Sequence, residues 1–150
     1  MTPIPPPPGP TDPFTLAKGH LQRAQTASRD PIDWTDLSTY GFYCLEAAVM
    51  AAADHVGMSV KHTHPAKAKA AQQLASAHGV PDISSLLGDL NEARKATAYG
   101  DTAFPDLDAD DLIREVEEYV EQIGELIDSE FDDEEDDEGV EDTAEPPAAS

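Results

Sequence analysis

Apolar residues recur along most of this chain at the three- and four-residue spacing of an α-helix. The first clear case is residues 13–28, where Phe14, Ala17, Leu21 and Ala24 share one face of a helical projection. Alternation of apolar and polar residues, which is typical of strands, is nearly absent. The pattern therefore predicts an all-α protein.

The periodic segments and the breaks between them predict about five helices. Capping residues, glycines and prolines place these helices at 13–28, from a cap at residue 33 or 35 to about 57, 65–77, 83–100, and from a cap at residue 108 or 110 to about 128. Linkers of this length favour neighbours that run up and down. The predicted fold is a compact antiparallel bundle.

The second helix has the composition of a buried central helix. Its segment LSTYGFYCLEAAVMAAA, residues 37–53, carries only one charged residue, Glu46. A helix that is apolar nearly all round is normally surrounded by other helices. Cys44 lies in the middle of this segment, so we expect it in the core.

Length and composition divide the chain into three parts. A chain of 150 residues has room for one modest core. Residues 1–12 are rich in proline and predict a disordered tail. Residues 13–128 form the helical bundle. Residues 129–150 are so acidic and so poor in apolar residues that they predict a second disordered tail.

Negative charge is concentrated in the last third of the chain. Residues 1–100 hold eight Lys/Arg and nine Asp/Glu, a net charge of −1, whereas residues 101–150 hold one basic residue and 22 acids, a net charge of −21. This excess argues against general DNA binding, which needs lysine and arginine. The densest acidic run either binds a basic protein partner or only keeps the protein soluble through charge repulsion. Its residues are Asp132, Asp133, Glu134, Glu135, Asp136, Asp137 and Glu138.

Several function classes lack the motifs that they require. No apolar run is long enough for a membrane span, and residues 1–13 do not resemble a secretory signal. A single cysteine forms no internal disulfide, so we expect a cytoplasmic protein. His62 and His64 form an H-x-H pair without further ligands at zinc spacing, so we predict no metal and no cofactor. Nucleotide-binding glycine loops and nucleophile motifs are also missing.

Three stretches within residues 14–128 stand out in chain order: DWTDLSTYGFYCLEAAVMAAADHVG, KHTHPAKAKAAQQLA and PDISSLLGDLNEARKATAYGD. Together they resemble the HEPN family of helical domains, in which similar stretches occur in the same order. The resemblance implies a nucleotide- or RNA-binding helical module. It also implies a homodimer, and a role in a bacterial or phage toxin–antitoxin or defence system.

The HEPN ribonuclease motif, an arginine followed by four to six residues and a histidine, does not occur in this chain. From Arg94 the permitted positions hold Tyr99, Gly100 and Asp101, and no other arginine reaches a histidine. A phenol with a pKa of about 10 is a poor proton shuttle at neutral pH. By the resemblance, the matching edge, Arg94, Lys95, Tyr99 and Asp101, is a ligand-binding site without catalysis. The alternative is structural, with Arg94 paired to a nearby acid and Tyr99 packed on the core.

Three functions follow from these observations. The first is a non-catalytic HEPN-like module that binds a nucleotide, an RNA end or a protein partner. The second is a divergent HEPN ribonuclease whose active site is displaced. The third is an acidic decoy, similar to an antitoxin, whose C-terminal tail blocks a basic partner.

Overall fold

The described part of the chain folds into five helices. The computed structural model describes residues 12–100 and 104–140, and the side chains of residues 12–100 and 104–128. Within these residues all the regular structure is helical, which confirms the predicted all-α class. The helices are α1 (Pro13–Ala27), α2 (Trp34–Val56), α3 (His64–His78), α4 (Ser84–Tyr99) and α5 (Ala109–Val140).

Short polar side chains fix where four of the helices begin. Asp12 and Asp33 accept hydrogen bonds from the backbone N–H groups three residues later, at the starts of α1 and α2. Asp108 accepts hydrogen bonds from the backbone N–H groups of Asp110 and Asp111 at the start of α5. Thr63 caps α3, so that α3 begins one residue before the predicted Pro65.

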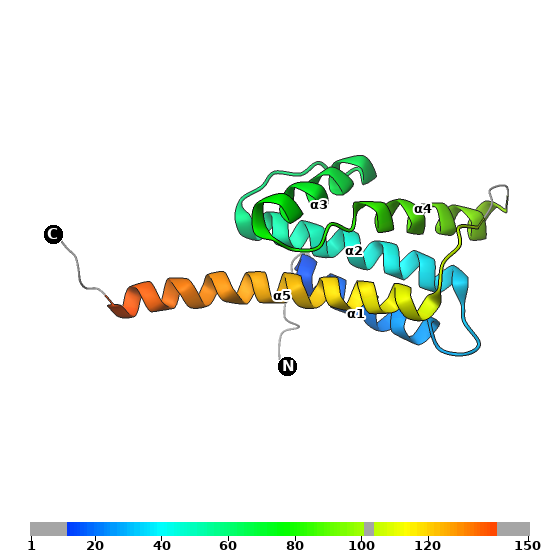
Figure 1. Cartoon of the computed structure of the whole chain (residues 1–150), viewed down its shortest axis with the longest axis horizontal. Helices are drawn as coiled ribbons and strands as arrows, with labels where there is room; N and C mark the ends of the chain where they lie inside the picture. Colours follow the sequence, from blue (N-terminus) through cyan, green and yellow to red (C-terminus); the bar gives the residue numbers. More distant parts are fainter. Residues whose placement is uncertain (1–11, 101–103, 141–150) are drawn as a thin grey trace, which may run out of the picture.

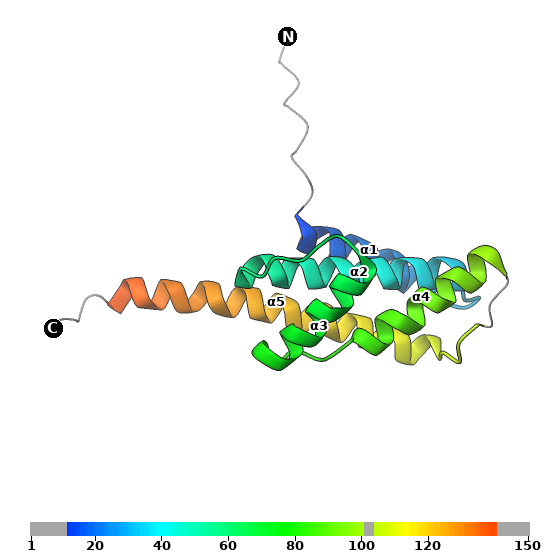
Figure 2. The ribbon, with the colours of Figure 1, turned by 90° about the horizontal axis from the view of Figure 1, so that it is seen from above.

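Helix α2 is the centre of the bundle. Figures 1 and 2 show α1 antiparallel to α2 on one side, with α3 and α4 lying across another face. Because α3 crosses α2 steeply, only α4 reverses the chain direction between α2 and α5. Helix α5 therefore runs beside α2 in the same direction (Figure 1).

The core forms where the other four helices pack around α2. The predicted apolar faces of α1, α4 and α5 are largely buried, and Cys44 is fully buried as expected. The sequence spacing predicts that Ala66, Ala70, Leu74 and Ala77 of α3 face inward. Ala70 and Leu74 are buried together with Ala71, whereas Ala77 is exposed. The largest fully buried side chains include Tyr119, Phe42, Leu37, Leu45, Leu74, Leu90, Leu112 and Ile123.

Helix α5 is longer than the sequence predicted. We expected helicity to fade near residue 128, where the acidic run begins, but the backbone is helical to Val140. An established helix adds residues without a new nucleation cost, and no glycine or proline interrupts residues 125–138. Figures 1 and 2 show this extension continuing beyond the rest of the bundle.

The ends of the chain are only partly described. The predicted N-terminal tail, apart from Asp12, and the last ten residues of the predicted acidic tail lie outside the described residues.

Each helix in the described part is too short or too polar to cross a membrane.

Candidate functional site

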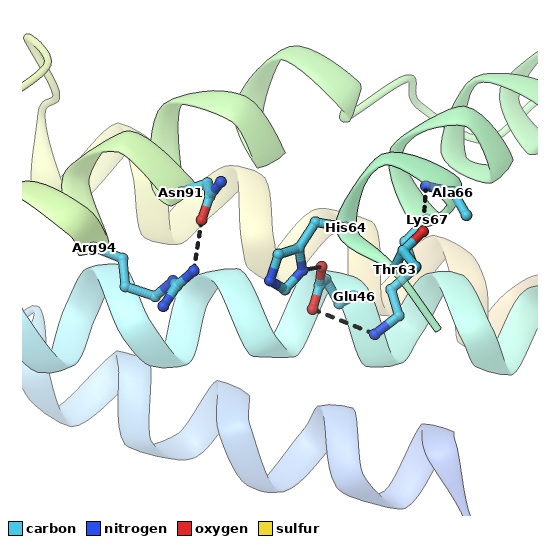
Figure 3. Close-up of polar contacts among 7 residues, drawn as sticks. All are labelled: Glu46, Thr63, His64, Ala66, Lys67, Asn91 and Arg94. Carbon is cyan, nitrogen blue, oxygen red and sulfur yellow. Dashed lines mark hydrogen bonds and ion pairs between the residues drawn. The ribbon is translucent and has the colours of Figure 1, made fainter. Parts of the chain in front are cut away.

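A buried carboxylate joins two helices near the middle of the bundle. Glu46 belongs to α2 and is only 6% exposed. Its Oε2 lies 2.6 Å from Nδ1 of His64, and its Oε1 lies 3.5 Å from Nζ of Lys67 (Figure 3). His64 and Lys67 are three residues apart on α3, so they face the same side of that helix.

This contact explains why an apolar helix carries a charge. Burying a carboxylate in a packed interior costs roughly several kcal/mol of folding free energy unless cations or hydrogen-bond donors compensate its charge. Lys67 and His64 supply that compensation, and the Thr63 cap sets the start of the helix that carries them. Glu46 therefore ties α3 to α2.

Arg94 of α4 faces the interior of the bundle. Its guanidinium carbon lies 5.1 Å from the centre of the Phe42 ring, and its Nη2 donates a 2.7 Å hydrogen bond to Oδ1 of Asn91. Figure 3 shows Arg94 reaching from α4 down to α2. The Nε of Arg94 is buried and has no hydrogen-bond partner among the described residues.

Phe42 also contacts His64. The two ring centroids are 5.0 Å apart in an edge-on arrangement. An arginine and a histidine from different helices therefore share one aromatic ring. The arginine-to-histidine spacing of the HEPN motif places both residues on one helix, so it does not predict this pair. The H-x-H sequence was its only local signal.

The edge predicted from the family resemblance is not assembled as one surface. Arg94 turns inward, whereas Tyr99 is 73% exposed and Lys95 is exposed. Five residues along a helix correspond to a rotation of about 140° between side chains. Arg94 and Tyr99 therefore lie on different sides of α4. Asp101 lies outside the described residues.

A cavity of about 640 Å³ lies beside Glu46, between α1, α2 and the segment that leads into α3. Its walls combine carboxylates, aromatic rings and apolar side chains. The lining residues are Asp12, Pro13, Leu16, His20, Tyr43, Glu46, Ala47, Met50, Asp54, His62 and Lys67. The sequence did not indicate this cavity, because its walls come from three separate segments.

The side chains of Cys44, two residues before Glu46, and of His20, which lines the cavity, have pKa values that favour their neutral forms. Burial raises the pKa of the Cys44 thiol to about 12, which disfavours a thiolate nucleophile. Burial, with the neighbouring charge of Arg23, lowers the pKa of His20. In the described part of the chain, His, Cys, Asp and Glu side chains form no group of three that could hold a metal ion.

The acidic run of residues 132–138 is described only in its backbone. It lies within the last turns of α5. The proposed partner-binding acids are therefore carried by a helix and project from the bundle with it (Figure 2).

Comparison with protein-family models, curated proteins and solved structures finds no match to this chain in any of the three.

Proposed function

We propose that this chain is a non-catalytic helical interaction module that binds a basic protein partner through the acidic extension of α5. The observation that carries the proposal is the continuous helical backbone through residues 132–138, where every residue is an acid. This extension lies beyond the bundle, where a partner can approach it (Figure 1).

The helical backbone concentrates negative charge. A helix places one residue about every 1.5 Å along its axis, whereas an extended strand places one about every 3.3 Å. Double-stranded DNA carries one negative charge per roughly 1.7 Å of axis. An all-acidic helical segment therefore approaches the charge density of a nucleic acid, which suits the nucleic-acid-binding face of a basic protein.

The charges of the bundle support a protein partner over a nucleotide or RNA end. Arg94 already covers Phe42 and donates to Asn91, and Lys67 already pairs with Glu46. We further propose that the module is HEPN-like, that it forms a homodimer, and that it acts in a cytoplasmic toxin–antitoxin or phage-defence system. These parts rest on the sequence alone.

Neutralising the acidic run should weaken binding to a basic probe. We expect that replacing the seven acids of residues 132–138 with their amides raises the Kd for a labelled decalysine peptide by about tenfold or more. This corresponds to about 0.2 kcal/mol or more per charge at physiological salt. Fluorescence anisotropy over a salt series measures the change, and the salt dependence should become shallower.

A matched control changes the same number of charges elsewhere. In this control variant, seven exposed acids outside residues 132–138 are replaced with their amides. They are Asp89, Glu92, Asp106, Asp110, Glu115, Glu118 and Glu121. The proposal fails if both variants weaken decalysine binding equally. It also fails if a 5′-phosphorylated oligoribonucleotide binds the wild-type chain more tightly than decalysine does.

A second function, a divergent ribonuclease, is favoured by the shared contact of Arg94 and His64 with Phe42. The Glu46 carboxylate orients the half-exposed His64 ring, as in general acid–base sites. A guanidinium near such an imidazole can stabilise phosphate charge.

An RNA-cleavage assay separates the two functions. Under our proposal the wild-type chain leaves a single-stranded RNA substrate intact. Cleavage that is lost in both His64→Ala and Arg94→Ala, but kept in Tyr99→Phe, would establish the ribonuclease instead. Tyr99 is a suitable control because its side chain is largely exposed.

A further inference from the structure

We propose that the cavity between α1 and α2 receives a cationic side chain, lysine or arginine, of the partner protein. This inference rests on the proposed function, because it assigns a second contact to the same basic partner. It concerns the bundle rather than the α5 extension, so each contact can be tested alone.

The formal charge of the cavity suits a cation. Three carboxylates line it, from Asp12, Glu46 and Asp54, against one lysine, which leaves a net charge of −2 with histidines neutral. That lysine, Lys67, is already paired with Glu46 and is only 17% exposed. Asp12 and Asp54 lie at the exposed rim, where an incoming cation would meet them.

The remaining walls suit the aliphatic stem and the charged end of such a side chain. Leu16, Ala47 and Met50 supply apolar surface. Tyr43 lines the cavity and is 38% exposed as a residue, and the centroid of its ring lies 5.7 Å from that of the His20 ring. Aromatic faces attract cations. Because the pKa of His20 is lowered, its ring is neutral near pH 7 and does not repel a cation.

The position of Asp54 is unfavourable for α2 itself. Asp54 lies in the last turn of this helix, which ends at Val56. The C-terminal end of a helix carries partial negative charge, so an acid there is repelled. A bound cation would offset this repulsion, so binding a cation would account for an acid that does not stabilise its own helix.

The size of the cavity also fits. Sites for small ligands commonly measure about 300–1,000 Å³, and this cavity measures about 640 Å³. It therefore has room for the stem of one long side chain together with neighbouring atoms of the partner.

Nuclear magnetic resonance of the full-length chain tests the inference. The probe is the peptide acetyl-Gly-Gly-Lys-Gly-Gly-amide, and its neutral match carries norleucine in place of lysine. We expect the lysine peptide to shift the amide signals of Tyr43, Met50 and Asp54, and the norleucine peptide to leave them unchanged. Asp54→Asn should weaken this binding about two- to fivefold, the range for an exposed charge pair.

A purely structural role for Asp54 is excluded by a second readout. Because Asp54 is unfavourable at the end of α2, Asp54→Asn should melt at a temperature no lower than wild type. Asp89→Asn removes one exposed acid from α4 and should leave peptide binding unchanged. Equal weakening in both variants would overturn the inference, because only net charge would then matter.

Two further outcomes are decisive. Spermidine is the first additional probe. If spermidine shifts the amide signals of the cavity residues and the lysine peptide does not, the site binds a small polyamine and the inference is overturned. The variant with amides at residues 132–138 should keep the peptide-induced shifts. If this variant loses affinity for decalysine, and the lysine peptide does not shift the cavity signals of the wild-type chain, the proposed function stands and the cavity inference fails.

Discussion

Replacing Tyr119 with alanine should destabilise the fold by about 3–5 kcal/mol, whereas replacing it with phenylalanine should stabilise the fold by about 1 kcal/mol. The Tyr119 side chain is fully buried in the core. Alanine would remove the packing of an entire ring and leave a cavity. Phenylalanine keeps the ring and removes a buried hydroxyl that has no hydrogen-bond partner among the described residues.

Urea denaturation of the three proteins measures both effects. The expected midpoint is highest for Tyr119→Phe and lowest for Tyr119→Ala. Burial, followed by the charge of Asp82, raises the pKa of Tyr119, so the phenol stays neutral at ordinary pH and its loss removes no charge. A lower midpoint for Tyr119→Phe than for wild type would mean that the hydroxyl stabilises the native protein, contrary to this account.

Removing both partners of Glu46 should destabilise the fold by about 3 kcal/mol. The double variant His64→Ala with Lys67→Met leaves the Glu46 carboxylate buried between α2 and α3 without a cation. Breaking a buried ion pair typically costs about 3–5 kcal/mol. We expect the lower end of this range because His64 is half-exposed.

A third substitution separates the charge effect from lost packing. Glu46→Met added to the double variant removes the stranded carboxylate and keeps a side chain of similar length. It should recover most of the lost stability, since an apolar replacement of a buried ion pair is often neutral. Chemical denaturation measures the cycle. Equal stability of the double and triple variants would mean that Glu46 is not stabilised by these partners.

The helices could be predicted because their signals are local. Periodic apolar residues place α1, α4 and the start of α5 to within about one residue. Of the two candidate caps at each position, Asp33 caps α2 and Asp108 caps α5. The buried centre at α2 followed from a segment with a single charge. Each of these signals lies within about one helical turn or one helix, so no tertiary information is needed.

The end of α5 was harder to predict, because two local effects oppose each other there. Like charges four residues apart destabilise a helix by about 0.2–0.5 kcal/mol per pair. Glutamate has a high helix propensity, and a formed helix propagates without a new nucleus. The composition of residues 129–140 indicated disorder, whereas the backbone is helical.

The site depended on contacts that cross the chain. Glu46 and His64 are 18 residues apart in the sequence, and Phe42 meets both His64 and Arg94 only after α3 and α4 pack on α2. The predicted edge of Arg94 and Tyr99 came from the family resemblance, which matches positions along one helix. It did not include the direction of each side chain, which depends on what the helix packs against.

The sequence by itself determined the helical class, the helix starts to within about two residues, and the division between nearly neutral residues 1–100 and acidic residues 101–150. Spacing, capping chemistry and charge act over a few residues, so they can be read without a fold. Only the tertiary structure decided that Glu46 joins α2 to α3, that Arg94 faces inward, and that a cavity with acidic groups lies beside Glu46. These features exist because helix packing brings distant residues together, and the apolar pattern that drives this packing does not specify which polar side chains meet.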